Sequence, residues 1–489
     1  MGKAMAAKTT ITGKGGIFLV WATVAVFITV ASAGTYSGGT GTAEDPYLIS
    51  TGEDMQSIGA NPNDWDAHFV LTKDIDLGYY DGQDERPEFN IIAEYPDSFV
   101  GVFDGNNHVI RNFTVSLGGL QRAIALFCNT DNGALIKNLD MENSYVNVPE
   151  GNRIAAIHGE GISDIVNCKV SGTIIGNYYV GGLSGQNYGT TERCSSYSKI
   201  VGGSGGGLIG RNSGIVNQCY SRSMVSGSDE VGGLVGRNYG LITNSCSESL
   251  VTADSYGAGG LVGENTDTIL SCYALGNTNG NSCVGGLVGD GGGGLIENCY
   301  ALVDVNGNSD VGGLIGLYYS GTVSNCYAGG KVSGAETNVG GLLGREYSPP
   351  SIDFNANFWN YDLNPSYSGI GNASDPNVIG KTTVQMRTMS TFTDAGWDFV
   401  DEVVNGPNDI WDICEGTNYP KLAWQIPAAD FVCPDGVNSA DYSFFAGHWL
   451  NNDCGTSDNC DNTDLDLSGS IDINDLKIFA ENWLSGVGQ

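Results

Sequence analysis

The sequence is poor in basic residues and shows little helical patterning. Its 489 residues include 21 Lys and Arg against 55 Asp and Glu, so the formal net charge is −34. Contacts to phosphate groups come from Lys and Arg, and this deficit excludes nucleic acid as a partner. The same charge favours solubility and cation binding. Gly accounts for 74 residues, and only 16% of residues are charged, which is typical of a turn-rich β protein.

Long hydrophobic runs are also scarce. The apolar run Ile17–Val30 is shorter than the roughly 20 residues that a membrane-spanning helix needs. Lysines precede this run, and Ala31-Ser32-Ala33 follows it as a small-residue cleavage site. We therefore interpret residues 1–33 as a signal peptide and not as a membrane anchor. This interpretation predicts a secreted or cell-surface protein with no stable membrane span after cleavage.

Two repeating markers are present. A Val-Gly-Gly-Leu-Val-Gly phrase returns seven times in slightly altered spellings, with steps of 25, 26, 27, 26, 27 and 28 residues. Its leucines are Leu183, Leu208, Leu234, Leu261, Leu287, Leu314 and Leu342. A second ladder runs in step with it through Cys168, Cys194, Cys219, Cys246, Cys272, Cys299 and Cys326. A shared period of this length indicates stacked supersecondary units.

The units are predicted to contain strands only. Stretches such as Leu295–Val305 show no helical spacing, and the Leu-x-x-Leu-x-Leu frame of leucine-rich repeats is absent. At roughly 3.3 Å per residue, about 26 residues form a coil of two or three short strands, and neighbouring coils lie about 4.8 Å apart. We therefore expect a mainly β protein with a parallel β-helix of about ten coils.

These units resemble a known repeat. Val231–Gly236 followed by Leu241–Cys246, and Val311–Gly316 followed by Val323–Cys326, are similar to the GLUG repeat of bacterial surface and secreted proteins. The resemblance implies a right-handed β-helix and an extracellular location, and it brings no catalytic residue. Some proteins of that wider group are metalloproteases, but this chain contains no His-Glu-x-x-His motif.

Cysteines that recur at the coil period occupy equivalent sites, which we predict to be buried and inert. A metal stack or disulfides between coils are the alternatives. Near the C-terminus, Cys433, Cys454 and Cys460 are expected to supply one disulfide, and their pairing and that of Cys414 stay open.

Polar residues also recur at the coil period. Asn is suited to coil corners because it tolerates left-handed backbone geometry. One such series is Asn112, Asn138, Asn167, Asn298 and Asn325, and a second is Asn187, Asn212, Asn238 and Asn265. The residues before the second series, Gln186, Arg211, Arg237 and Glu264, are expected to face solvent, with Arg237 pairing with Glu264. The acids Asp229, Glu230, Asp254, Asp267 and Asp304 have no basic partner at matching coil positions.

We predict five regions along the chain. Residues 34–98 form an N-terminal cap, with a helix capped by Thr51 over Met55–Ile58 and a strand over Phe69–Leu77. Residues 99–347 form the β-helix, and residues 430–489 form a separate module. Residues 348–429 are an aromatic-rich cap or linker that contains Trp359, Tyr361, Trp397, Trp411, Tyr419 and Trp424. Burial of these rings is favoured over stacking on sugars.

The C-terminal module contains two related copies at an offset of 34 residues, from Asp441 and from Asp475. The loop before the second copy carries side-chain oxygens at positions 1, 3, 5, 9 and 12 of a twelve-residue frame, position 7 offers its backbone carbonyl, and Gly469 stands at position 6. This spacing predicts a calcium site. The candidate ligands are Asp464, Asp466, Ser468, Ser470, Asp472 and Asp475.

This pair of loop-helix units resembles a type I dockerin, a small module that docks into a cohesin domain on another protein. The resemblance covers Asp430–Leu484 and implies a cohesin-like partner, with Ser439 and Ala440 in one half and Ile473 and Asn474 in the other facing it. The first loop departs from the family, because Val432 stands at position 3 and Gly436 comes one place late. Its candidate calcium ligands are Asp430, Asp435, Asn438 and Asp441.

We find no catalytic constellation in the sequence, which favours an exported, non-enzymatic binding or structural protein. Its β-helix would present an adhesion or ligand surface, with a polysaccharide or cell-surface glycan as a candidate ligand, and its C-terminal module would fasten it to a partner. The alternative is a polysaccharide-degrading enzyme, a lyase or glycoside hydrolase, on a β-helix scaffold. A third hypothesis makes the module a vestigial calcium clip that only stabilises the C-terminus.

Overall fold

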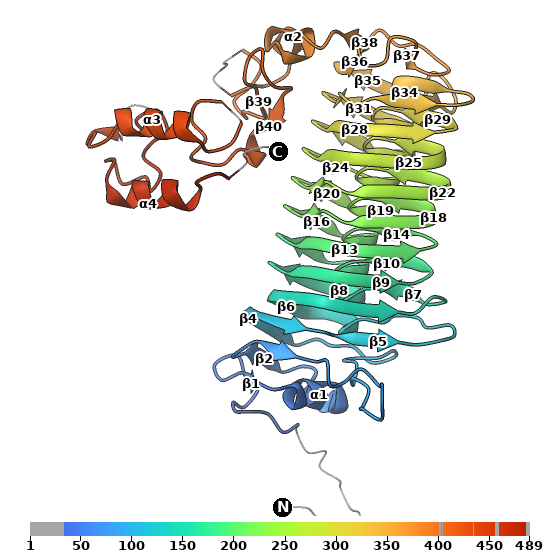
Figure 1. Ribbon diagram of the computed structural model, residues 1–489, viewed down its shortest axis with the longest axis vertical. Coiled ribbons are helices and arrows are strands. Elements are labelled where there is room, and N and C mark those ends of the chain that lie inside the picture. The colour runs from blue at the N-terminus through green and yellow to red at the C-terminus, as the bar shows by residue number, and fades with distance from the viewer. Residues whose placement is uncertain (1–33, 401, 403, 434, 455–458, 486–489) are drawn as a thin grey trace, which may run out of the picture.

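The computed structural model describes residues 34–400, 402, 404–433, 435–454 and 459–485. One column of stacked side chains runs along the molecule, and each member pairs in parallel with the next. The column is Phe103, Ile136, Ile165, Thr191, Val216, Ile242, Ile269, Ile296, Val323 and Phe354. The chain is therefore mainly β, with a parallel solenoid of about ten coils (Figure 1). The predicted signal peptide lies outside the described residues.

The strands pair in register in long stacks. The stack that carries the column above contains β12 Thr190–Glu192, β16 Ile215–Asn217, β20 Leu241–Thr243, β24 Ile269–Leu270, β27 Leu295–Glu297, β31 Gly321–Ser324 and β35 Ile352–Asn355. The next along the chain contains β9 Lys169–Ile175, β13 Ser195–Gly202, β17 Tyr220–Ser221, β21 Cys246–Ser247, β25 Tyr273–Gly285, β28 Tyr300–Gly307, β32 Tyr327–Ala328, β33 Val332–Gly334, β36 Asn357–Asn360 and β38 Val378–Lys381.

The Gly-rich phrase forms the remaining stacks. One contains β7 Asn152–Ile154, β10 Tyr178–Gly181, β14 Gly205–Gly206, β18 Met224–Gly232, β22 Leu250–Gly259, β29 Ser309–Gly312 and β37 Ser368–Ile370. Another contains β8 His158–Val166, β11 Ser184–Asn187, β15 Ile209–Asn212, β19 Val235–Asn238, β23 Val262–Asn265, β26 Val288–Gly291, β30 Ile315–Tyr318 and β34 Val339–Glu346. The first coils use β1 Tyr47–Ile49, β2 His68–Leu71, β3 Ile75–Asp76, β4 Val102–Arg111, β5 Thr114–Ser116 and β6 Phe127–Asn147.

The two predicted Asn series play different roles. Asn112, Asn138, Asn167, Asn298 and Asn325 have φ angles of 60°, 51°, 55°, 52° and 50°, which confirms the left-handed corners. The second series is fully buried instead. The Nδ2 group of each residue donates to the Oδ1 atom of the next at 2.8–2.9 Å, through Asn187, Asn212, Asn238 and Asn265. This amide ladder crosses four coils inside the solenoid and satisfies buried polar groups.

The cysteine ladder is confirmed as buried, with one correction. Nine cysteines among the described residues are free and buried, and burial raises the pKa of the Cys128 and Cys246 thiols to about 12. Cys246, however, is not a rung of the ladder. The backbone N–H of Cys219 donates to Ser245 Oγ at 3.0 Å, so Ser245 takes that site, and Cys246 pairs with Tyr220 and Tyr273 on the opposite face.

The N-terminal segment closes one end of the solenoid. Helix α1 spans Gly52–Ala60, and Thr51 and Asp54 form the predicted capping box at its start; η1 at Pro62–Asp64 follows. The single strand predicted over Phe69–Leu77 is wrong, because the chain forms β2 and β3 with Thr72–Asp74 between them. None of the helices in the described ranges is long and apolar enough to cross a membrane.

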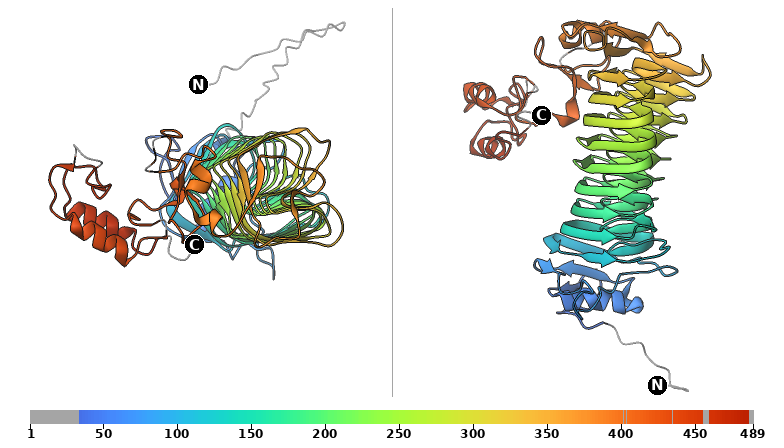
Figure 2. Two further views of the ribbon diagram at one scale, coloured as in Figure 1. Left: turned by 90° about the horizontal axis from the view of Figure 1, so that it is seen from above. Right: turned by 45° about the vertical axis from the view of Figure 1, so that its right-hand side comes forward.

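The aromatic-rich stretch folds back along the side of the last coils. It contains η2 Gln385–Arg387, α2 Ser390–Thr393, β39 Trp411–Asp412, β40 Lys421–Leu422 and η3 Ala423–Gln425. Trp359, Trp397 and Trp411 are buried as predicted, whereas Trp424 is 38% exposed. Trp411 packs against the stacked rings of Tyr300 and Tyr327, 6.1 Å from each. Figure 2 shows this cap beside the upper coils and the following two-helix module projecting away from them.

Candidate metal centre

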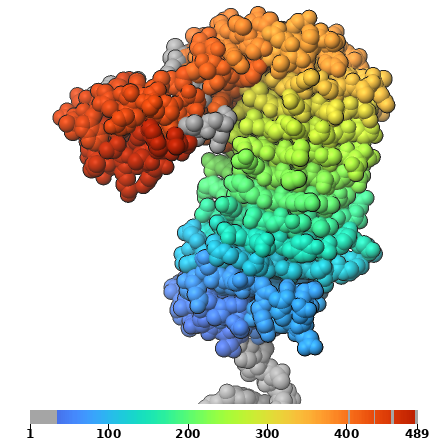
Figure 3. All heavy atoms as spheres, viewed as in Figure 1, coloured from blue at the N-terminus to red at the C-terminus, as the bar shows by residue number. Residues whose placement is uncertain are grey.

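The C-terminal module is built from two equivalent helix starts. Helix α3 spans Ser439–Gly447 and α4 spans Ile473–Glu481, and each begins with a capping box. The N-cap residues are Asn438 and Asp472, and the N3 carboxylates are Asp441 and Asp475. The rings of Phe445 and Phe479 meet between the helices at 5.1 Å. Figure 3 shows the module standing clear of the solenoid.

The second loop gathers three carboxylates. Oxygens of Asp464, Asp466 and Asp475 all lie within 4.8 Å of one another. Asp464 accepts hydrogen bonds from the backbone N–H groups of Ser468 at 3.0 Å and Gly469 at 2.8 Å. Gly469 has a φ angle of 90°, which allows the sharp turn predicted at this position. The loop is therefore wrapped around its first carboxylate.

The other predicted ligands of this loop make local contacts. Ser468 Oγ donates to the backbone carbonyl of Ser470 at 3.1 Å. The side chain of Asp472 accepts from the N–H of Asn474 at 2.8 Å and so caps α4. The structure thus brings together the carboxylates of Asp464, Asp466 and Asp475, while Ser468, Ser470 and Asp472 make hydrogen bonds within the loop and at the start of α4.

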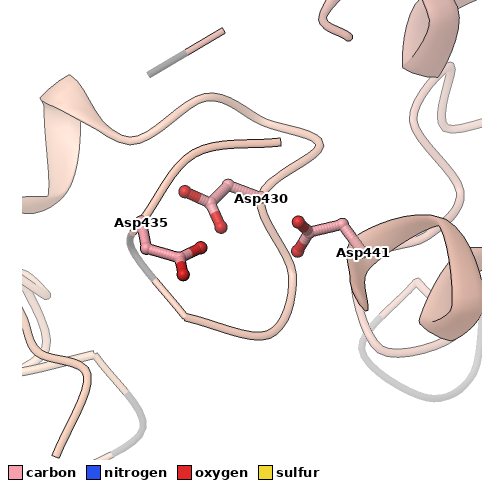
Figure 4. Close-up of side chains that lie close together, drawn as sticks. All are labelled: Asp430, Asp435 and Asp441. Atoms are coloured by element: carbon pink, nitrogen blue, oxygen red, sulfur yellow. The ribbon is translucent and has the colours of Figure 1, made fainter. Parts of the chain in front are cut away.

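The first loop gathers a matching set despite its irregular sequence. Oxygens of Asp430, Asp435 and Asp441 lie within 4.8 Å of one another (Figure 4). Asp441 is buried and accepts from the N–H groups of Phe431 at 2.8 Å and Val432 at 3.0 Å. Asn438, the fourth predicted ligand, turns its amide to Asp435 Oδ1 at 2.8 Å.

The electrostatics of the first loop favour a cation. Burial, together with the neighbouring charges of Asp441 and Asp435, raises the pKa of Asp430 to about 6. The Oδ1 atom of Asp430 is buried and has no hydrogen-bond partner among the described residues. A hard cation prefers a shell of carboxylate and carbonyl oxygens, which both loops offer. The residues present therefore fit calcium in both loops.

Two disulfides fasten the module. Cys454 bonds to Cys460 within the segment between the two halves, and Cys433 of the first loop bonds to Cys414 of the cap. The prediction of one disulfide among Cys433, Cys454 and Cys460 was therefore incomplete. Sequence spacing did not reveal Cys414 as the partner of Cys433 because the two lie in different predicted regions, 19 residues apart.

Paired apolar side chains are exposed on the module. Trp449 and Leu450 after α3 are 38% and 70% exposed, and Trp483 and Leu484 after α4 are 45% and 58% exposed. The predicted partner-facing residues Ser439, Ala440, Ile473 and Asn474 are also exposed. Both halves thus present similar surfaces.

The solenoid carries a charged cluster that sequence reasoning missed. Glu230 forms an ion pair with Arg237, and Arg237 Nε also lies 3.4 Å from Glu264, which confirms the predicted pairing with Glu264. No basic residue was predicted beside Glu230 at a matching coil position, and its partner comes from a different position, because the bend of the Gly-rich phrase returns Arg237 to it seven residues later. Gln186, expected to face solvent, is fully buried.

A neighbouring carboxylate extends this cluster along the next coil. Asp290 pairs with Glu264 in the strand register and accepts from the Tyr256 hydroxyl at 2.6 Å. Burial raises the pKa of Asp290 to about 6. Its Oδ1 atom is buried without a hydrogen-bond partner in the described part of the chain.

Comparison with known proteins identifies the repeat. The family model of the GLUG motif matches residues 280–306 and 307–333. Halomucin of Haloquadratum walsbyi is 31% identical over 157 residues, 31% of this chain and 2% of that protein. A protein of Evansella cellulosilytica described as a Gly-rich membrane protein is 33% identical over 181 residues, 37% of this chain and 18% of that protein. The chain therefore spans only a small part of these curated relatives.

Two solved structures align over much of the chain at low similarity. One, described as an immunoglobulin A1 protease from Bacteroides ovatus, gives a TM-score of 0.34 at 20% identity, covering 80% of this chain and 95% of that one. Another, described as an IgA1 protease, gives a TM-score of 0.32 at 15% identity, covering 68% and 22%.

Proposed function

We propose that this chain is an exported, non-enzymatic binding protein of the cell surface. In this proposal the solenoid presents a ligand surface, and the C-terminal module binds calcium and docks to a cohesin-like protein. The observation that carries the proposal is the convergence of Asp464, Asp466 and Asp475 within 4.8 Å in a loop of calcium-binding spacing. The same arrangement recurs at Asp430, Asp435 and Asp441.

Each loop would hold one calcium ion. Asp464, Asp466 and Asp475 would be the main ligands in the second loop, with Ser468, Ser470 and Asp472 around them. Asp430, Asp435 and Asp441, with Asn438, would serve in the first. Bound calcium would neutralise the clustered carboxylates and hold each loop on the first turn of its helix. Each loop is joined to the first turn of its helix, because Asp441 and Asp475 each belong to a loop and to the first turn of the helix that follows it.

The exposed residues of the module support a docking role. Trp449 and Trp483 lie after the two helices at equivalent positions and remain exposed, as do Leu450 and Leu484. Aromatic anchors of this kind dominate the binding energy of protein interfaces. The Trp-Leu pair repeats in both halves, whereas the predicted partner-facing pairs Ser439-Ala440 and Ile473-Asn474 differ, so the two halves would contact a partner differently.

The names of the relatives support a surface location. Halomucin and the Gly-rich membrane protein are similar to about a third of this chain, and the predicted signal peptide agrees with export. An acidic, Gly-rich solenoid whose free thiols are buried is suited to an oxidising exterior.

A calcium-dependent pull-down tests the proposal. The full chain is applied to immobilised cohesin domains of several types, either in calcium at about 2 mM or in EDTA. This calcium concentration is roughly the millimolar range in which extracellular calcium sites bind. Binding of at least one cohesin in calcium and its loss in EDTA are expected. Calcium binding without any cohesin binding would instead support the calcium-clip hypothesis.

A polysaccharide-degrading enzyme is the second candidate, and the cluster of Glu230, Arg237, Glu264 and Asp290 favours it. A carboxyl group with a raised pKa beside a second carboxylate is the arrangement of a general acid and its partner in glycoside hydrolysis. Arg237 is already shared between two carboxylates, and ion pairing accounts for its place in the cluster. Release of reducing sugar from a glycan panel, abolished by Asp290→Asn, would establish this candidate.

A further inference from the structure

A cavity of about 140 Å³ lies in the seam between the cap and the solenoid. Its solenoid wall is formed by outward-facing residues of β25 and β28, which are Tyr273, Leu275, Tyr300 and Leu302. Its cap wall includes Arg387, Thr417, Asn418, Tyr419, Lys421 and Gln425. Figure 1 shows β39 and β40 of the cap beside these coils. The cavity is separate from both carboxylate loops.

The charge of the cavity is opposite to that of the protein. The chain has a net charge of −34, yet the described lining residues include two cations and no carboxylate. Lys421 stands opposite Asp412 in the β39–β40 pair, so its charge has a nearby counterpart. Arg387 lies over the ring of Tyr419, with Cζ 5.5 Å from the ring centre. An acidic protein thus offers a local site for an anion.

Arg387 also presents an unused hydrogen-bond donor. Its Nε atom is buried and has no hydrogen-bond partner among the described residues. Leaving a buried donor without a partner is unfavourable. The Arg387 side chain lines the cavity, and its guanidinium fork suits the two oxygens of a carboxylate.

The opposite wall is apolar and rigid. The rings of Tyr273 and Tyr300 are stacked at 5.0 Å with an interplanar angle of 4°. The Tyr300 hydroxyl donates to Gln425 Oε1 at 3.0 Å, and that oxygen also accepts from the N–H of Leu422 at 3.0 Å. Gln425 therefore ties the cap to the solenoid at the cavity wall, and the shape of the cavity is formed before any ligand binds.

We propose that this cavity binds a single carboxylate-bearing sugar unit, a hexuronate, with its carboxylate at Arg387 and its ring against Leu275 and Leu302. An inorganic anion would use the guanidinium but not the apolar wall, and a neutral sugar would leave Nε of Arg387 unsatisfied. The hydroxyl and amide groups of Thr417 and Asn418 supply partners for the sugar hydroxyls. The proposal does not depend on calcium binding or docking.

Calorimetric titration of the full chain with D-glucuronate and D-galacturonate tests the proposal, with D-glucose and sulfate as comparison probes. At least one uronate is expected to bind at least tenfold more tightly than glucose or sulfate. Arg387→Gln is expected to weaken uronate binding at least tenfold. Leu275→Trp, which fills the cavity from an outward-facing position and leaves Arg387 in place, is expected to abolish it.

Arg345→Gln is the matched control. Arg345 also lies 5.5 Å from a tyrosine ring, that of Tyr347, but it is outside the cavity, and uronate binding is expected to be unchanged. No uronate binding to the wild-type chain would overturn the proposal, as would equal binding by Arg387→Gln or equal affinity for sulfate. The titration is repeated in EDTA. Unchanged uronate affinity there is expected, so failure of the calcium module and failure of this site give different results.

Discussion

The second of the two proposed calcium loops gives the sharpest prediction, because the side chain of Asp475 belongs to both the loop and the first turn of α4. Asp475 accepts hydrogen bonds from the N–H groups of Asp466 at 3.1 Å and Asp472 at 2.8 Å, and it is one of three converging carboxylates. In Asp475→Asn, one acceptor oxygen is replaced by an NH₂ group that faces a backbone donor. One charge of the proposed site is lost as well.

The expected size of the effect follows from these contacts. A hydrogen bond to a charged group contributes about 1.5–3 kcal/mol, so we expect calcium binding to weaken by about 2–3 kcal/mol, or about 30- to 150-fold. Removing one of three crowded carboxylates also relieves repulsion in the calcium-free loop, which limits the loss of stability without calcium. Asp475→Asn should therefore lower the free energy of unfolding less in the calcium-free protein than in the calcium-bound protein.

Isothermal titration of the full chain with calcium measures this effect. The wild-type chain should bind two calcium ions, Asp475→Asn should retain only the first-loop site, and Asp441→Asn only the second. Asp353→Asn, at an exposed position on the solenoid, is the control and should bind two. The reasoning is refuted if the wild-type chain gives no calcium heat, or if Asp475→Asn keeps both sites at wild-type affinity.

Three further predictions concern the body of the molecule. Asn238→Ala should lower the free energy of unfolding by about 3 kcal/mol in chemical denaturation, because it leaves buried amide partners on both sides unpaired, and an unchanged midpoint would contradict the ladder. Burial lowers the pKa of His158 to about 4. The stability that the neutral side chain contributes is therefore complete above about pH 6.5, the ordinary pKa of His, and it falls by about 3 kcal/mol as the pH falls towards 4. His158→Asn should flatten this decline in denaturation experiments at different pH values. Non-reducing peptide mapping should recover a peptide that joins Cys414 to Cys433, and its absence would refute that disulfide.

The period of the repeat was enough to predict the solenoid and most of its interior. Two markers in step place like residues above one another, which is why the Asn298 and Asn325 corners and the buried cysteines follow from the sequence. The exception is Cys246. Spacing alone tolerates a shift of one residue, but in a strand that shift moves a side chain to the other face, and Ser245 takes the interior position.

Contacts across a bend were beyond the reach of the sequence. Glu230 and Arg237 are seven residues apart and share no coil position, and only the tight Gly-rich turn brings them together. In the first of the two proposed calcium loops, the structure instead keeps an arrangement that the sequence pattern put in question. Its sequence departs from the family pattern at Val432. The backbone N–H groups of Phe431 and Val432 nevertheless donate to Asp441, and three carboxylates converge. Hydrogen bonds of the main chain, which a residue pattern does not reveal, keep the carboxylates of this loop together.

The stacked tyrosines under the cap restrict how such a chain can grow. Insertion of a whole coil below Tyr273 would lengthen the rod and leave every vertical neighbour of the inserted residues correctly matched. Insertion between Tyr300 and Tyr327 would separate the two rings whose hydroxyl groups donate to Gln425 Oε1 and to the Pro420 carbonyl. Gain and loss of coils by duplication should therefore be tolerated in the lower and middle rod, while the top three turns are inherited as one unit with the cap.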